Sequence, residues 1–171
     1  MTESPTNERM VEVFLSSIVT RRTSQQQLIK LKEKGGERSF PIVIGLPEAA
    51  EIRRVVKEQR TERPMTHELL VNTIEALGSK IMRVDIIDLR NHTFFAQLIL
   101  EGTDGQQNGE QSTVVDARPS DAIALALRGG VPLRVAESIL AEVRTDDGTD
   151  PLEDQEQDDE SDDDESESDD E

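Results

Sequence analysis

Alternating apolar and polar positions predict short strands along most of the first half of the chain. Val, Ile, Leu and Phe dominate residues 10–20, and Ser16 and Ser17 interrupt that strand and predict a bend. Residues 26–33 and 38–44 follow, joined by a Gly-containing turn, and predict a hairpin. The same pattern predicts further strands at 81–89, 93–100, 112–116 and 132–135. Arg90-Asn91-His92 forms a tight turn in this scheme, because Asn tolerates a positive φ.

Helical spacing and end signals predict three longer helices and one short one. The first begins at Pro47, whose missing N–H costs nothing at a first helical position. The second has Thr66 as its expected N-cap and Gly78 as its terminating residue. Its expected inward face consists of Leu69, Leu70, Thr73, Ile74 and Leu77. The third and fourth span about 120–128, before Gly129-Gly130, and 137–143.

The order of these elements predicts an α+β fold. Sequential strands with short turns favour a mostly antiparallel or mixed sheet of about six to seven strands, with three to four helices, in a single domain. We expect a flexible N-terminus over residues 1–9, a folded domain over 10–144 and a disordered acidic tail over 145–171.

The charge of the chain is concentrated at one end. The formal net charge is −18, but Asp146 to Glu171 carry 17 of the 37 acidic residues and none of the 19 basic ones. Residues 1–145 are therefore almost neutral, with 20 acidic and 19 basic residues. A dense run of carboxylates resembles the charge of a nucleic-acid backbone. It predicts a tail that modulates nucleic-acid binding or recruits a basic partner, or one that only improves solubility.

The absence of several residue types and signals indicates the cellular compartment and excludes some kinds of catalysis. Cysteine is absent, which excludes disulfides and thiol catalysis and suits a reducing cytosol. The start of the chain lacks the features of a secretion signal, and no run approaches the ~20 apolar residues of a membrane span. We expect a cytoplasmic protein without membrane contact. Trp and Tyr are absent and all four Phe are expected in the core, which removes the usual stacking platform for single strands.

Charged side chains cluster where the strand at 112–116 meets the third long helix. Asp116 and Asp121 could together hold Mg²⁺ or Mn²⁺, and Arg118 could grip a phosphate with its planar fork. Ser120 is a second candidate for binding phosphate. The alternatives are structural: Ser120 and Asp121 are typical of helix starts, and Arg118 could pair with Asp116 or Asp121.

Two residues outside this junction are further catalytic candidates. His67 lies at the start of the second helix, where it could be a general base or a metal ligand, or simply cover the helix end. Glu48 follows the strand that ends near Ile44. It could join the acidic set if the sheet brings the two strand ends together, or merely complement the dipole of its own helix.

Several stretches resemble one known family. Asp116 to Leu127 is similar to the signature of the bifunctional nuclease family. The other similar stretches, in the same order along the chain, are Phe40–Gly45, Arg63–Leu70 and Pro132–Ala136. The resemblance covers roughly residues 10–143 and includes the position of Glu48. It implies cleavage of DNA and RNA, whereas His92 falls in a turn where the family carries other residues.

The resemblance therefore implies a nuclease that cleaves DNA or RNA phosphodiester bonds, and the paired carboxylates favour metal assistance. In that hypothesis Asp116 and Asp121 lie near the metal, Arg118 binds the phosphate and His67 is the base. The competing hypothesis is a regulatory module without enzymatic activity, in which the turn at 116–120 binds an anionic ligand. A third interpretation is that the same turn braces a homo-oligomer, because exposed strand edges favour pairing.

Overall fold

The computed structural model describes residues 8–19, 26–102 and 112–143, so the predicted acidic tail lies outside the described residues. The same holds for residues 1–7 of the predicted N-terminal segment and for most of the polar connection after Gly102. Within the described parts of the chain, no helix is long and apolar enough to cross a bilayer.

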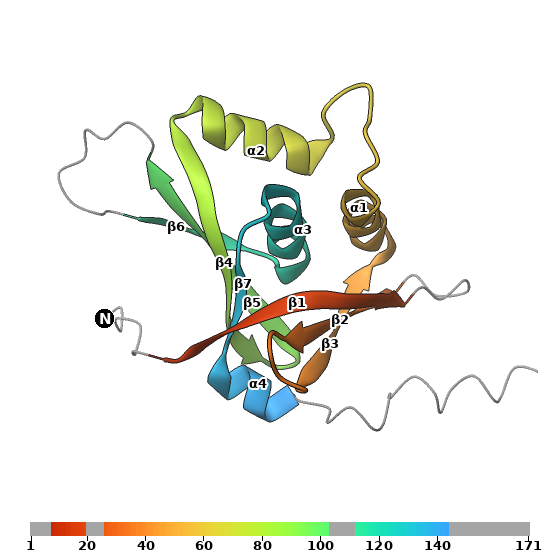
Figure 1. Ribbon diagram of the computed structural model, residues 1–171, viewed down its shortest axis with the longest axis vertical. Helices are drawn as coiled ribbons and strands as arrows, with labels where there is room; N and C mark the ends of the chain where they lie inside the picture. Colours follow the sequence, from red (N-terminus) through yellow and green to blue (C-terminus); the bar gives the residue numbers. More distant parts are fainter. Residues whose placement is uncertain (1–7, 20–25, 103–111, 144–171) are drawn as a thin grey trace, which may run out of the picture.

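The predicted fold class is confirmed: the described residues form one seven-stranded mixed sheet and four helices in a single small domain (Figure 1). The strands are β1 (Met10–Val19), β2 (Gln26–Glu33), β3 (Ser39–Gly45), β4 (Ser79–Arg90), β5 (Thr93–Gly102), β6 (Thr113–Ala117) and β7 (Leu133–Ala136). The helices are α1 (Leu46–Val56), α2 (Thr66–Ala76), α3 (Pro119–Gly129) and α4 (Glu137–Val143).

The strand order β3-β2-β1-β7-β4-β5-β6 explains why the sheet is mixed. Hairpins join β1 to β2, β2 to β3 and β4 to β5, and all of these pairs are antiparallel. The chain then passes through α3 and inserts β7 between β1 and β4. Only a crossover can place a strand parallel to an earlier one, and β7 runs parallel to β4.

Irregular pairing curls this sheet so strongly that its two ends approach each other. The register shifts between Leu15 and Ser17, at the predicted bend, and twice along β4. Such bulges increase the local twist and bend a strand. As a result Phe40 of β3 contacts Phe94 of β5, with 5.8 Å between ring centroids, although four strands separate β3 from β5 in the sheet.

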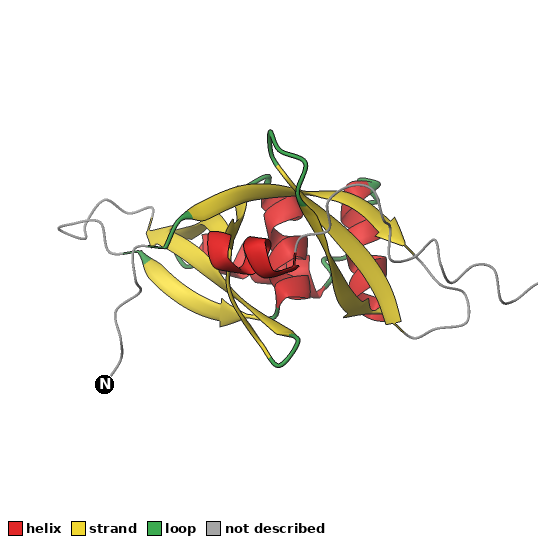
Figure 2. Cartoon of the chain, turned by 90° about the horizontal axis from the view of Figure 1, so that it is seen from below, coloured by secondary structure: helices red, strands yellow, loops and turns green. Residues whose placement is uncertain are grey.

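Helix α3 fills the concave side of the curled sheet (Figures 1 and 2). Six of its residues are buried, in a run interrupted only at Asp121: Ser120, Ala122, Ile123, Ala124, Leu125 and Ala126. Its small alanines allow the helix to approach the sheet and α1 closely. The helix ends at Gly130, which has φ +60° and is therefore in the left-handed conformation that closes helices. This packing fixes the first turn of α3, and hence Arg118 and Asp121.

Helix α2 differs from its sequence-based prediction at both its start and its inward face. Met65 is the N-cap and Thr66 the first helical residue, so Thr66 is not the cap. None of the residues of α2, all of which the structure describes, is buried, and Leu77 is 78% exposed. The expected apolar face is wrong except at Ile74, which is half-buried. The side of α2 that faces the protein instead includes His67, which contacts α1 and α3, and Val71, which packs against the core. The expected end at Gly78 is confirmed by its φ of +72°.

The expectation that all four phenylalanines lie in the core is wrong. Phe40 is fully buried, whereas Phe94 and Phe95 are half-buried and Phe14 is 46% exposed. Arg90 lies over the ring of Phe95, 5.3 Å from its centroid. The β4–β5 turn is as predicted, with positive φ at Asn91 and at His92. Aromatic surface is therefore present near this turn.

Candidate functional site

An open cavity of about 730 Å³ lies where α1, the start of α2, the end of β6 and the start of α3 meet. Apolar residues from five elements, α1, α2 with its N-cap, β5, β6 and α3, form much of its wall: Pro47, Met65, Leu70, Leu98, Val115 and Leu125. The polar residues gather on one side and include five of the predicted candidates and one addition: Glu48, Glu51, His67, Asp116, Arg118 and Asp121. The curled sheet thus brings together residues that are far apart in the sequence.

Arg118 links the two acidic residues on either side of it. Its Nε and Nη2 donate to the two carboxylate oxygens of Asp121, at 2.7 and 3.1 Å. Its Nη1 donates to Glu48 Oε1 at 3.1 Å, across 70 positions of sequence. Gly45 makes the approach of Glu48 feasible, because a Cβ at that position would collide with the Glu48 carboxylate. The Arg118 side chain is nevertheless 67% exposed.

His67 lies between two carboxylates and is mostly buried. Its Nε2 is 3.0 Å from Asp121 Oδ1. Because an ionised carboxylate only accepts hydrogen bonds, Nε2 carries the proton in this contact. Its Nδ1 is 3.8 Å from Glu51 Oε1, beyond hydrogen-bond distance. Nδ1 is therefore the ring nitrogen that can take up a proton, and Glu51 is placed to stabilise the imidazolium that results.

Glu51 is the centre of a charge cluster that sequence reasoning missed. Arg128 Nη2 donates to Glu51 Oε1 at 3.0 Å, and Arg54 donates to Glu51 Oε2. Glu51 is 10% exposed, Arg54 14% and Arg128 18%. The available signal was the spacing of Glu51 and Arg54, which places them on one helix face. The contact with Arg128 depends on the packing of α1 against α3 and had no local signal.

The electrostatic surroundings keep the buried carboxyls ionised. Burial alone would raise the pKa of Asp121, but hydrogen bonds from Arg118 and His67 outweigh it and lower that pKa below its ordinary value. Burial acts on Glu51 in the same way, and the hydrogen bonds from Arg54 and Arg128 lower the pKa of Glu51 as the net result. The contact with Asp121 in turn raises the pKa of Arg118.

These two lowered pKa values predict a loss of stability in acid. A carboxyl with a lower pKa in the folded state than in the unfolded state stabilises the fold above its unfolded pKa and loses that contribution as the pH falls. We expect the free energy of unfolding to decline below about pH 4.5, the ordinary value for Glu. Urea unfolding across pH 3–7 measures this, with the double variant Glu51→Gln, Asp121→Asn as comparison. An equally steep acid decline in that variant would contradict the assignment.

The other candidate residues occupy different surroundings. Asp116 is exposed on β6 and lines the cavity; among the described residues, no hydrogen bond or ion pair to its side chain is observed. Ser120 is buried in the first turn of α3, and Arg118 rather than Ser120 is the N-cap. Ser120 lines a second cavity of about 510 Å³, together with His92.

The acidic side chains of the cavity are not arranged to hold a divalent metal. Within the described residues, no group of three or more His, Asp or Glu side chains is arranged to hold a metal ion. Both oxygens of Asp121 are occupied by Arg118, and Oδ1 also contacts His67. As arranged, Asp116 and Asp121 do not fit a metal centre. Binding of Mg²⁺ or Mn²⁺ stays a prediction, and we assign no catalytic step to a metal.

Comparison with known proteins connects this site to a family. Residues 29–147 match the sequence model of the bifunctional nuclease domain, a range that contains every polar residue of the site. An uncharacterized protein of Mycobacterium tuberculosis is 39% identical over 133 residues, which cover 78% of this chain and 76% of that protein.

Rice proteins match a somewhat smaller share of the chain. Bifunctional nuclease 1 of Oryza sativa subsp. indica is 26% identical over 120 residues, and bifunctional nuclease 2 of subsp. japonica is 25% identical over 115. These matches cover 70% and 67% of this chain but only 35% and 34% of the rice proteins. The chain therefore corresponds to about a third of each of those relatives.

Proposed function

Because this chain belongs to the bifunctional nuclease domain family, we propose that it is a nuclease that cleaves phosphodiester bonds of DNA, RNA or both. The observation that carries the proposal is that one carboxylate contacts both an exposed guanidinium and a mostly buried histidine. Asp121 contacts both Arg118 and His67 inside the open cavity. Such an arrangement can bind a phosphate and move a proton beside it.

Arg118 supplies the phosphate contact in this proposal. A guanidinium has five N–H donors, and three of them are used by Asp121 and Glu48. One N–H on each terminal nitrogen is left for a ligand, and the side chain is largely exposed. Two N–H groups of one guanidinium match two oxygens of a phosphodiester. Glu48 and Asp121 hold the guanidinium in place.

His67 supplies the proton transfer. With Nε2 bonded to Asp121, Nδ1 accepts the proton that water loses as its oxygen bonds to phosphorus, and the imidazolium returns a proton to the leaving oxygen as the other P–O bond breaks. Glu51, 3.8 Å from Nδ1, stabilises the imidazolium formed in that step. Asp116 lies at the cavity wall as an exposed carboxylate and is the candidate for orienting the water. The acidic tail competes with nucleic acid for Arg118 through its own carboxylates, so it lowers affinity at low salt.

A cleavage assay tests the proposal directly. Labelled DNA and RNA, each single-stranded and duplex, are incubated with the purified full-length chain in Mg²⁺, Mn²⁺ or EDTA. We expect cleavage, and a KM for Arg118→Ala that rises about tenfold to a hundredfold, because a hydrogen bond to a charged group contributes roughly 1.5–3 kcal/mol. Arg53→Ala, on the outer side of α1, is the matched control.

Two outcomes of this assay would contradict the nuclease proposal. Absence of cleavage under every metal condition would remove the nuclease proposal. Thermal stabilisation by nucleotides without any turnover would instead favour the anionic-ligand module. Comparison with a chain that ends at residue 145 measures the effect of the tail. Equal affinity of the two chains at low salt would show that the tail does not compete.

A further inference from the structure

The cavity at the site continues into the second cavity, and Arg118 lies at their junction. The two cavities share four lining residues, Glu48, Asp116, Ala117 and Arg118. The second has a volume of about 510 Å³ and lies between β3, the start of β5 and the start of α3. It exists because the curled sheet brings β3 close to β5, as the contact of Phe40 with Phe94 shows. Together they form one groove with a cation in the middle, which we call the Arg118 groove.

The walls of the Arg118 groove are apolar on both sides of that cation. In the first cavity Met65 is 49% exposed, Leu70 41% and Val115 39%, so these side chains are available to a ligand. Two half-buried aromatic residues, Phe94 and Phe95, line the second cavity; the Phe94 ring packs against Phe40, and Arg90 lies over the Phe95 ring. Large exposed apolar surface of this kind marks binding sites. A ligand that fits therefore has one anionic centre flanked by two flat or apolar groups.

The carboxylates of the site weaken its attraction for an anionic ligand, so that the affinity for such a ligand depends on the apolar walls. Four carboxylates, of Glu48, Glu51, Asp116 and Asp121, line the groove. The guanidiniums that balance them are those of Arg54, Arg118 and Arg128, and two of these are mostly buried against Glu51. Attraction to a phosphate backbone by charge alone is consequently weak. Binding of a strand has to draw on contacts with its bases.

From these observations we propose that the Arg118 groove binds an unpaired strand, with one phosphodiester on Arg118 and the flanking bases in the two cavities. The inference rests on the proposed nuclease function and specifies its substrate class as single-stranded nucleic acid. A base presents its flat face to an apolar wall only when it is released from a duplex stack. The free N–H groups of Arg118 complement the single negative charge between two such bases.

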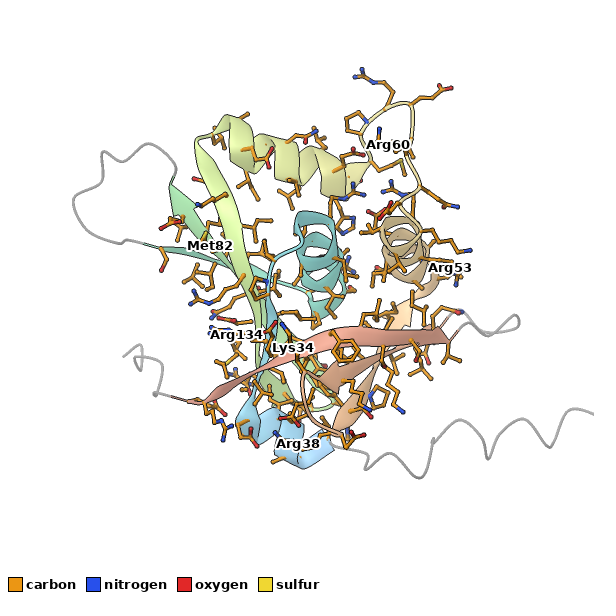
Figure 3. The ribbon with its side chains drawn as sticks, viewed as in Figure 1. Lys34, Arg38, Arg53, Arg60, Met82 and Arg134 are labelled. Carbon is orange, nitrogen blue, oxygen red and sulfur yellow. The ribbon has the colours of Figure 1, made fainter. Side chains whose placement is uncertain are left out.

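A duplex would require a different surface. Duplex binding relies on rows of cations that follow the phosphates. One group of exposed basic residues, Lys57, Arg60 and Arg63, follows Arg53 along the chain, and none of the three lines either cavity. Figure 3 shows Arg53 and Arg60 on one side of the molecule, on α1 and on the segment that leads to α2. This surface is separate from the groove and is the alternative to be excluded.

The test measures binding and cleavage separately in the full-length chain. The probe is a 12-nucleotide oligonucleotide, labelled at one end, as a single strand and annealed to its complement. Phe95→Ala and Leu70→Ala remove wall contacts on either side of Arg118. Phe95→Leu keeps an apolar side chain, and Phe14→Ala, on β1 away from both cavities, is the matched control.

We expect the single strand to bind more tightly than the duplex and to be cut faster. Phe95→Ala should raise Kd and KM for the single strand roughly tenfold, because one base stacked on an aromatic ring contributes about that factor or more. Leu70→Ala should raise both by a smaller factor, because it removes only an apolar contact. Their kcat should change little, Phe95→Leu should be intermediate and Phe14→Ala should match the unmodified chain. Thermal melts of every variant identify losses that come from unfolding.

The outcomes separate this inference from the nuclease proposal. Tight binding of the single strand that depends on Phe95 and Leu70, without cleavage, would support the groove as the binding site and contradict the nuclease proposal. Cleavage that is unchanged in Phe95→Ala and Leu70→Ala would contradict the groove as the binding site and support the nuclease proposal. Equal binding of duplex and single strand, or binding that is weakened by Arg53→Ala with Arg60→Ala and not by the groove variants, would overturn the inference. Absence of both binding and cleavage would overturn both proposals.

Discussion

Replacing His67 with Ala is expected to reduce kcat for nucleic-acid cleavage by about a hundredfold to ten-thousandfold, the usual contribution of a positioned proton-transfer group. Its ring is fixed by the contact of Nε2 with Asp121 and faces Glu51 through Nδ1. Loss of the ring removes the proton acceptor and leaves Arg118 in place. KM should therefore change much less than kcat. Initial rates over a range of substrate concentrations measure both quantities.

The pH dependence of the rate distinguishes proton transfer from a structural role of His67. In His67→Gln the side chain amide can still donate to Asp121 but cannot take up a proton. We expect this variant to lose one limb of the pH–rate profile, whereas a purely structural variant would keep its shape at reduced amplitude. Asn72→Ala, an exposed position on the same helix, is the control. If His67→Gln cleaves at the unmodified rate, His67 is not the proton acceptor.

Replacing Asp85 with Ala is expected to lower the free energy of unfolding by about 3 kcal/mol, the lower end for breaking a buried ion pair. Asp85 lies on β4 and is only 5% exposed. It accepts two hydrogen bonds from Arg134 of β7, at 2.7 and 2.8 Å, and one from Arg83. Arg134, labelled in Figure 3, lies on the neighbouring parallel strand. Without Asp85 its charge loses its partner at the centre of the sheet.

Urea unfolding measures this loss, and the same strand offers a control. Asp88 of β4 pairs with Arg90, which is 70% exposed, so Asp88→Ala should cost at most about 1 kcal/mol. Asp85 lines neither cavity. We therefore expect kcat and KM per folded molecule to remain unchanged in Asp85→Ala. Equal destabilisation by the two substitutions would show that the buried pair with Arg134 adds no stability beyond that of an exposed one.

The individual polar residues of the site could be selected from the sequence, but their partners could not. Arg118 and Asp121 are three positions apart at a helix start, so local geometry was enough to suggest an ion pair between them. Glu48 joins Arg118 from 70 positions away, and His67 joins Asp121 from 54. Those contacts require the particular curl of the sheet and the packing of α1 and α2 against α3. No local pattern encodes that arrangement.

In helix α2 the orientation observed in the structure differs from the one that the spacing of its apolar residues predicts. Spacing placed its leucines inward, whereas the structure turns His67 inward and leaves Leu69 58% exposed. The contacts of His67 with Asp121 of α3 and with Glu51 of α1 lie on the side that faces the body of the protein. Leu70, turned aside from the core, instead lines the cavity. The helix therefore departs from the predicted orientation at the position where the charged residues around His67 adjoin the apolar wall of the cavity.

By itself the sequence determined the kinds and order of the elements, the turn at Asn91 and the charged start of α3, because each depends on residues close together in the chain. The tertiary structure alone decided that β7 enters between β1 and β4, that Glu51 faces His67, and that two cavities meet at Arg118. The physical reason is the curl of the sheet around α3. Bulges and packing of distant strands produce it, and their combined effect is set by contacts between residues that no short stretch of sequence brings together.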